Sequence, residues 1–271
     1  MNRLQSLFGR KKNNILSVYL TAGYPHLDST VPVIKALENG GIDMIELGLP
    51  FSDPMADGKT IQDSSTKALR NGMTPKLLLE QAAEARRAGV KVSMILMSYL
   101  NPLMQYGAQQ LCEDCKNAGI DGMIVPDLPY ASDGAKDNNL IESASEAGIA
   151  MINMITPETS EKRLHLIDLA SQNGAPGSFI YMVSDAATTG TRTSGFGEKQ
   201  LDYFRSIAEM NLRSPRLIGF GISNPETLEQ AVTYSNGAII GSLFIKMLTN
   251  NPDNPDQAVR ELLTHLGLEP R

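Results

Sequence analysis

The sequence contains few of the residues that build disulfide frameworks or metal sites. Its 271 residues include two cysteines and three histidines. Cys112 and Cys115 are spaced CxxC, but a zinc site needs two further ligands, and no histidine has the matching spacing. The surrounding segment, QQLCEDCKNAG, has a helical pattern, which favours reduced thiols packed one turn apart. We therefore expect neither a metal site nor a redox centre.

Long basic runs and long apolar runs are also missing. The longest basic run, Arg10-Lys11-Lys12, is too short for a nucleic-acid surface. No apolar run reaches the roughly 18 residues of a membrane span. The first residues, MNRLQSLFGRKKNN, lack the apolar stretch and cleavage site of a signal peptide and predict a short amphipathic helix. We expect a cytoplasmic protein that binds neither nucleic acid nor membranes.

The composition is that of a globular protein with a large core. Hydrophobic residues make up 42% of the chain and charged residues 20%. The formal net charge is −6, yet an acidic chain can bind an anion through backbone N–H groups in place of a basic patch. The length allows one or two domains, although α/β barrels of about 250 residues are commonly a single domain.

Eight short apolar runs recur along the chain, and helical patterns separate most of them. Each run is rich in Val, Ile, Leu or Met, and six of the eight end in Gly, Pro or Ser, which is typical of strands. The runs occupy residues 15–23, 43–50, 90–100, 121–129, 149–156, 178–184, 216–221 and 237–242. Strands that alternate with helices pair in parallel. Eight such units predict a single-domain (β/α)8 TIM barrel over residues 1–271, with an extra N-terminal helix.

The alternative architecture is an open, doubly wound sheet. Such a sheet usually has fewer strands and a G-x-G-x-x-G loop after the first strand, where this chain has TAGYPHLDS. Helix start signals at Thr74-Pro75, Ser160 and Asn224-Pro225 fit the repeated units of a barrel.

Two loops are longer than a plain barrel needs. FSDPMADGKT follows the second predicted strand, and DAATTGTRTSGFGEKQ follows the sixth. In a barrel both loops emerge on the C-terminal face, where active sites lie. Long loops at that position are often lids.

Residue alternation along the second strand predicts the position of Glu46. Glu46 shares one side of the strand with Met44 and Gly48, whereas the other side is purely apolar and suits packing beneath the helices. Glu46 therefore points into the barrel near its catalytic end. Burial raises the pKa of a carboxyl group, as a general acid near neutral pH requires. A structural carboxylate is the alternative, but charges are rarely buried without a function.

The loop after this strand contains two further acids, Asp53 and Asp57. Asp53-Pro54 and Asp57-Gly58 both suit simple turns. A catalytic interpretation depends on their context, because the loop lies on the expected catalytic face and brings a second carboxylate near Glu46.

The last two strands have the pattern of a phosphate site. GFGIS (219–223) and GAIIGS (237–242) each end a strand in glycine, with a helix close behind. Glycine permits close approach of the backbone, and the N–H groups of a helix N-terminus attract anions. Ordinary turns are the alternative, but barrels often bind phosphate after strands seven and eight. Tyr19 and Tyr181, both on strands, suit either an aromatic ligand or core packing.

The segment ELGLPFSDPMADG (46–58) resembles the signature of the tryptophan synthase α-subunit family almost position for position. The resemblance extends through KTIQDSSTKAL, and it includes YLTAGYP, VPDLP (125–129), GFGIS and GAIIGSLFIK. It thus covers nearly the whole chain. It implies a lyase of L-tryptophan biosynthesis that cleaves indole-3-glycerol phosphate, by a retro-aldol reaction, to indole and glyceraldehyde 3-phosphate.

The resemblance also implies roles for individual residues. Glu46 would be the acid/base that protonates the indole ring at C3, and Asp57 would stabilise the positive charge that develops at the indole N–H. The residues that match substrate-binding positions are Tyr19, Tyr181, Thr189, Gly190, Phe220, Gly221, Gly241 and Ser242.

A partner subunit follows from the same resemblance. The family needs no metal or cofactor for this step, and its pyridoxal phosphate belongs to a β subunit that receives indole through a tunnel. The expected assembly is an α2β2 heterotetramer, with Asp53, Pro54 and Asp127 near the surface that meets the partner. A related phosphate-binding barrel, a standalone lyase and a barrel that mainly activates a β partner are the alternatives.

One stretch departs from the family pattern. The loop after the sixth strand usually reads S-x-x-G-V-T-G, whereas residues 184–190 read SDAATTG. Thr189 and Gly190 are kept, but Ala187-Thr188 replaces the Gly-Val pair. Because this loop is the lid in the family, the change bears on lid closure and on communication with the β subunit.

Overall fold

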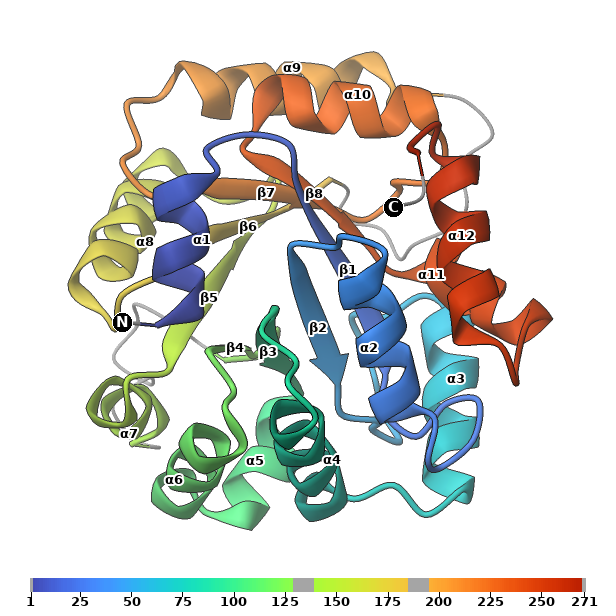
Figure 1. Cartoon of the computed structure of the whole chain (residues 1–271). Helices are drawn as coiled ribbons and strands as arrows, with labels where there is room; N and C mark the ends of the chain where they lie inside the picture. Colours follow the sequence, from blue (N-terminus) through green and yellow to red (C-terminus); the bar gives the residue numbers. More distant parts are fainter. Residues whose placement is uncertain (1, 129–138, 185–194, 270–271) are drawn as a thin grey trace.

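A computed structural model describes residues 2–128, 139–184 and 195–269. Each strand pairs in parallel with the next in sequence, and the last pairs with the first, so the sheet closes into a barrel (Figure 1). The closed barrel confirms the (β/α)8 prediction and excludes the open, doubly wound sheet. The strands are β1 (Ile15–Thr21), β2 (Met44–Gly48), β3 (Ser93–Met97), β4 (Gly122–Ile124), β5 (Ala150–Ile155), β6 (Ile180–Val183), β7 (Arg216–Gly219) and β8 (Gly237–Ile240).

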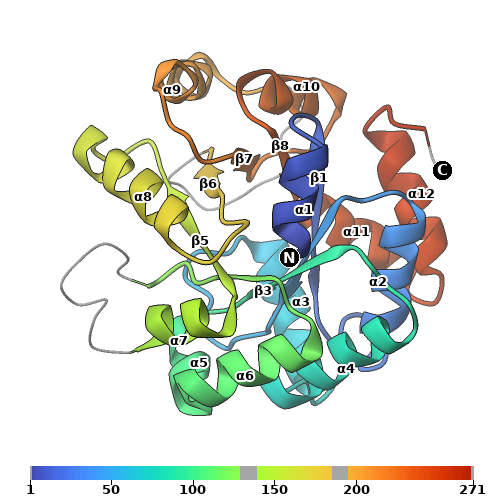
Figure 2. The same cartoon turned by 60° about the vertical axis from the view of Figure 1, so that its left-hand side comes forward.

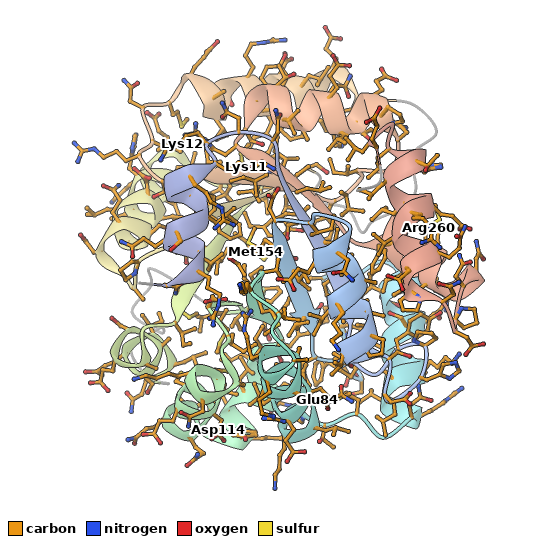
Figure 3. The ribbon with its side chains drawn as sticks, in the orientation of Figure 1. Lys11, Lys12, Glu84, Asp114, Met154 and Arg260 are labelled. Atoms are coloured by element: carbon orange, nitrogen blue, oxygen red, sulfur yellow. The ribbon has the colours of Figure 1, made fainter. Side chains whose placement is uncertain are left out.

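Helices surround the barrel, and charged side chains such as Glu84 and Arg260 project from them into solvent (Figures 1 and 3). The helices of the described residues are α1 (Arg3–Arg10), α2 (Thr30–Asn39), α3 (Lys59–Arg70), α4 (Pro75–Arg87), α5 (Leu100–Tyr106), α6 (Ala108–Ala118), α7 (Leu140–Ala147), α8 (Glu161–Asn173), α9 (Glu198–Glu209), α10 (Pro225–Tyr234), α11 (Ser242–Asn250) and α12 (Pro255–His265).

Capping explains why some helices begin where the sequence predicts. The Thr74 hydroxyl accepts a hydrogen bond from the Leu77 N–H (3.2 Å), and Pro75 opens α4. The Asn224 side chain does the same for α10, accepting from the Thr227 N–H at 2.9 Å. Ser160 precedes α8 as expected, but its side chain makes no capping hydrogen bond.

The strands are shorter than the apolar runs that predicted them. The run at 90–100 contains β3 only from Ser93 to Met97, and in the described part of the run at 121–129 the strand β4 extends only from Gly122 to Ile124. The flanking residues Val90, Val92, Tyr99 and Val125 are nevertheless buried. Loops next to the barrel pack against the same core as the strands, so hydrophobicity alone does not locate the strand ends.

The N-terminal helix α1 lies across one end of the strands instead of joining the surrounding ring (Figures 1 and 2). Leu4 and Leu7 are fully buried, as the amphipathic pattern predicts. The Asn2 side chain caps the helix and donates a hydrogen bond to the carbonyl oxygen of Asp121 (2.7 Å), immediately before β4. The helix therefore closes the amino-terminal end of the barrel, and the carboxyl-terminal end remains for a site.

The two cysteines lie on α6, where both are buried and neither forms a disulfide. Burial raises the pKa of the Cys112 thiol to about 11. Both residues therefore pack as apolar groups, as the sequence predicts. In the described part of the chain, no group of three or more His, Cys, Asp or Glu residues could hold a metal ion. Among the same residues, we find no helix with the length and hydrophobicity that crossing a membrane requires.

Candidate active site

A pocket lies at the carboxyl ends of the strands. Strands β1, β2, β3, β6 and β8, the loops after β2 and β7, and the first residues of α3 and α11 contribute to its lining. The lining residues are Tyr19, Glu46, Asp57, Ile61, Met97, Tyr181, Phe220, Gly221, Ile222, Ser223, Ile239, Gly241, Ser242 and Leu243. The described lining contains no Lys, Arg or His residue.

This lining brings together most of the residues that the sequence singled out. Both proposed catalytic carboxyls line the pocket, and so do six of the substrate-binding candidates. These candidates are Tyr19, Tyr181, Phe220, Gly221, Gly241 and Ser242. Thr189 and Gly190, with the altered pair Ala187-Thr188, lie outside the described residues.

Glu46 lies on β2 with only 1% of its surface exposed. It is paired in register with Tyr19 of β1, and both side chains face the pocket. Burial raises the pKa of Glu46 from its ordinary 4.5 to about 8, while a hydrogen bond from the Ser17 hydroxyl to Oε1 (3.1 Å) opposes that change. The Glu46 carboxyl therefore holds its proton at neutral pH and can act as a general acid.

Asp57 lies in the loop between β2 and α3 and is also buried. The Asp57 N–H donates to the carbonyl oxygen of Pro54 (3.1 Å), and Gln62 Nε2 donates to the Asp57 carbonyl oxygen (2.8 Å), so hydrogen bonds on both sides of Asp57 support the loop. Burial raises the pKa of Asp57 to about 6, and a hydrogen bond from the Tyr99 hydroxyl opposes this effect. Asp57 is thus mainly ionised at neutral pH, whereas Glu46 is mainly protonated.

Tyr99 is a neighbour of the site that the sequence reasoning missed. It follows β3, and its hydroxyl donates to Asp57 Oδ2 (3.0 Å) while accepting a hydrogen bond from the Ala56 N–H (2.9 Å). Its ring packs against Phe51 with 5.3 Å between centroids. A tyrosine at the carboxyl end of an apolar run was the available signal. The other lining residues that were missed are Ile61, Met97, Ile222, Ser223, Ile239 and Leu243.

Tyr19 and Tyr181 form two aromatic walls, and each lies over a glycine of the neighbouring strand. A Cβ atom on Gly48 would lie 2.1 Å from the Tyr19 hydroxyl oxygen, and one on Gly219 would lie 2.1 Å from that of Tyr181. Only glycine leaves room for these rings. Burial raises the pKa of both tyrosines, so both hydroxyls are neutral. Tyr181 also packs edge-on against Phe220, at 5.9 Å between centroids.

The chain after β7 adopts an unusual backbone conformation beside the pocket. Phe220 has a φ of 70° and Gly221 a φ of 78°, both in the left-handed region. A bulky residue rarely adopts this conformation, and such outliers cluster at functional sites. The Ser184 hydroxyl donates to the Phe220 carbonyl oxygen (2.8 Å) and so holds this turn in place.

Helix α11 begins at the pocket. Gly241 is its N-cap, without a side-chain cap, and Ser242 is its first residue. The first N–H groups of a helix have no intrahelical acceptor, and with the helix dipole they favour a bound anion. Gly241, Ser242 and Leu243 line the pocket at this end. An anion can therefore be bound here through backbone groups.

The three residues assigned to a partner surface lie near the same face of the barrel. Asp53 is exposed and Pro54 is half-buried, in the loop after β2. Asp127, also exposed, follows β4 and accepts a hydrogen bond from the Leu100 N–H (2.8 Å) at the start of α5. Asp127 thus also stabilises the start of α5.

Comparison with known proteins identifies one family along nearly the whole chain. The sequence pattern of the family described as tryptophan synthase alpha chain matches residues 5–269. The tryptophan synthase alpha chain of Parabacteroides distasonis is 53% identical over 266 residues, which cover 98% of this chain and 99% of that protein. The protein of the same name from Flavobacterium psychrophilum is 51% identical, with 93% and 95% of the two chains covered.

Solved structures agree with this comparison. The crystal structure of tryptophan synthase subunit alpha from Legionella pneumophila superposes with a TM-score of 0.82 at 31% identity, covering 98% of this chain and 97% of that chain. A mutant tryptophan synthase alpha-subunit from Pyrococcus furiosus gives a TM-score of 0.83 at 32% identity, with 94% and 98% covered. With the closed barrel and the sequence match along its length, this chain belongs to the tryptophan synthase alpha chain family.

Proposed function

We propose that the chain cleaves indole-3-glycerol phosphate to indole and glyceraldehyde 3-phosphate, as the alpha subunit of tryptophan synthase. The observation that carries this proposal is a pair of buried carboxyls in one pocket, where burial raises the pKa of Glu46 to about 8 and that of Asp57 to about 6. Pairs of carboxyls whose environments separate their pKa values commonly divide the acid and base roles. The family to which the chain belongs supports the same reaction.

In the proposed reaction, Glu46 donates its proton to C3 of the indole ring. The positive charge that develops at the indole nitrogen is stabilised by the ionised Asp57 carboxylate, which the Tyr99 hydroxyl orients. The bond between C3 and the glycerol carbon then breaks, and its electron pair restores the indole. The hydroxyl on the departing carbon becomes an aldehyde and returns a proton to the Glu46 carboxylate.

The remaining groups of the pocket suit the two ends of this substrate. Tyr19, Tyr181 and Phe220 offer apolar faces to the indole ring. Gly241 and Ser242 lie at the start of α11, whose backbone N–H groups would bind the phosphate, and Gly221 after β7 lines the same pocket. We propose that Thr189 and Gly190, in the loop after β6, complete this site.

We further propose the partner and setting that the family implies. The chain would work in the cytoplasm as part of an α2β2 heterotetramer, in which pyridoxal phosphate belongs to the β subunit and none binds to this chain. Asp53, Pro54 and Asp127 would contact that subunit. A barrel that only activates its partner would not need the two buried carboxyls, so we favour the catalytic interpretation.

The experiment is an assay of indole release from indole-3-glycerol phosphate, with and without the cognate β subunit. We expect release that increases when the partner is present, and co-purification of the two chains. The Asp57→Asn variant should lose activity by at least about 100-fold, because a neutral amide cannot stabilise the developing positive charge. Absence of indole under both conditions would refute the proposed function.

A further inference from the structure

Ser17 is fully buried on β1, directly beneath the pocket. It is paired in register with Met44 of β2 on one side and with Ile239 of β8 on the other. Two residues further along β1, Tyr19 lines the pocket, so alternation along the strand places the Ser17 side chain on the same inward side. A hydroxyl in this position needs a hydrogen-bond acceptor inside the barrel.

The acceptor is the Glu46 carboxyl. Ser17 Oγ donates to Glu46 Oε1 at 3.1 Å, and in the described part of the chain no other side chain hydrogen-bonds to this carboxyl. Oε1 accepts a hydrogen bond from the Ser17 hydroxyl, so the acid proton of Glu46 cannot occupy that side of Oε1. Oε2 has no hydrogen-bond partner among the described residues, and Glu46 lines the pocket.

We propose that Ser17 is a positioning residue for Glu46, which fixes the carboxyl rotamer through Oε1 and keeps the acid proton on Oε2, on the side of the substrate. This inference rests on the proposed function, in which Glu46 is the general acid. Ser17 does not touch the reacting atoms. Its hydroxyl determines where the proton of the acid is found and how firmly the carboxyl is held.

The surroundings of Glu46 make this hydrogen bond important. The ionisable groups that face it are Tyr19 of β1, Tyr181 of β6 and Asp57 of the loop after β2. Both tyrosines are neutral, and the described lining offers no cation. The Ser17 hydroxyl therefore favours the charged form of Glu46 without help from a basic side chain, and its loss should raise the pKa of that carboxyl.

Ser93 provides a matched control on a neighbouring strand. It lies on β3, paired in register with Met44 as Ser17 is on the other side, and it is likewise buried. Within the described residues, it makes no hydrogen bond to Glu46. Ser93→Ala therefore removes a buried hydroxyl of the same layer without changing the contacts of the acid.

The deciding experiment is a titration of the Glu46 carboxyl carbon by NMR in protein labelled with ¹³C-glutamate, with Glu46→Gln to assign the signal. In Ser17→Ala the midpoint should move upward by about one pH unit, because a hydrogen bond to the charged form is lost. Ser17→Thr, which keeps the hydroxyl, should restore the wild-type midpoint, and Ser93→Ala should leave it unchanged. An unchanged midpoint in Ser17→Ala overturns the inference.

Kinetics give a second measure with the same variants. In Ser17→Ala we expect kcat to fall by roughly tenfold with little change in KM, since the acid is misplaced while substrate contacts remain. Wild-type kcat in this variant, or an equal loss in Ser17→Thr and Ser93→Ala, would make Ser17 a packing residue only. If wild-type protein releases no indole, the proposed function fails, but the titration still decides the hydrogen-bond role of Ser17.

Discussion

Glu46 and Asp57 show how position within one pocket separates the pKa values of two carboxyl groups. Both are buried and both receive one hydroxyl hydrogen bond, from Ser17 and Tyr99 respectively. Glu46 lies deeper, on a strand inside the barrel, and its pKa rises to about 8, whereas the loop residue Asp57 reaches about 6. The difference in burial, with similar hydrogen bonding, supports the proposed roles of Glu46 as proton donor and Asp57 as anionic stabiliser.

The two pKa values predict a bell-shaped dependence of kcat/KM on pH. Activity requires ionised Asp57 and protonated Glu46, so it should rise as the pH passes about 6 and fall as it passes about 8. The second pKa of the substrate phosphate also lies near 6, so the alkaline limb is the more diagnostic one. Indole release measured between about pH 5 and 10 checks this, and a profile that stays flat above pH 8 would contradict it.

Burial of Glu46 should also make stability depend on pH. Between 4.5 and about 8, the folded chain holds a proton on Glu46 that the unfolded chain has lost. The contribution of Glu46 to the free energy of unfolding is therefore complete below about pH 4.5 and declines as the pH rises to about 8. Glu46→Gln removes this titration, so the Tm of the variant relative to wild type should increase between about pH 5 and 8 by several degrees.

Asp57→Asn is the matched control for this stability measurement. The pKa of Asp57 moves only from 3.8 to about 6, so its relative Tm should change over a lower and narrower pH range. A Tm difference between Glu46→Gln and wild type that is the same at every pH would show that Glu46 does not titrate as we expect.

At the scale of the elements, the glycines of β2 and β7 are as important to the pocket as the tyrosines. Gly48 and Gly219 lie under the rings of Tyr19 and Tyr181, which come from the adjacent strands β1 and β6. Strand pairing places each ring beside its glycine, because the two residues lie on adjacent strands. The positions of the two aromatic rings in the site thus follow from the register between β1 and β2 and between β6 and β7.

Gly219→Ala should displace the Tyr181 ring. The new methyl group would lie 2.1 Å from the tyrosine hydroxyl oxygen, so the ring must leave its place over β7. We expect a loss of about 1–3 kcal/mol in stability and a raised KM. Gly9→Ala on α1 is the control, because its methyl group meets no atom within 4 Å and should be neutral or slightly stabilising. An unchanged KM in Gly219→Ala would show that the position of the Tyr181 ring does not matter for substrate binding.

The sequence predicted the elements better than their ends and contacts. Apolar runs of strand length and capping residues such as Thr74 and Asn224 are local signals, and the order of strands and helices follows from them. The strand ends were overestimated, since buried loop residues such as Tyr99 continue the apolar pattern. Alternation along β2 placed Glu46 inside, because period two is a property of one strand.

Contacts between segments that are far apart in the sequence could not be predicted from the same local signals. The hydrogen bonds from Ser17 to Glu46 and from Tyr99 to Asp57 join residues 29 and 42 positions apart. They depend on register and on the path of a loop, neither of which is encoded in local periodicity. The role of Asp57 came from the family motif, and its burial and its tyrosine partner were apparent only in the fold.

In the whole molecule, the two ends of the barrel differ, because one is closed by a helix and the other holds the pocket. Helix α1 closes the amino-terminal end with fully buried leucines, while the carboxyl-terminal end holds the pocket. The strand β2, which carries Glu46, pairs with β1 and runs towards the pocket at the carboxyl-terminal end. An acidic chain with a net charge of −6 can accommodate a phosphate ester here because the start of α11 provides backbone donors.

The central claim is that Glu46 is the proton donor in cleavage of indole-3-glycerol phosphate. Its most direct test is a comparison of substrate affinity and single-turnover indole release in wild type and Glu46→Gln, both bound to the β subunit. Glutamine fills the same space but cannot donate the proton, so we predict similar affinity and a rate that is lower by about 100- to 10,000-fold. Near-normal release of indole by Glu46→Gln would contradict the account.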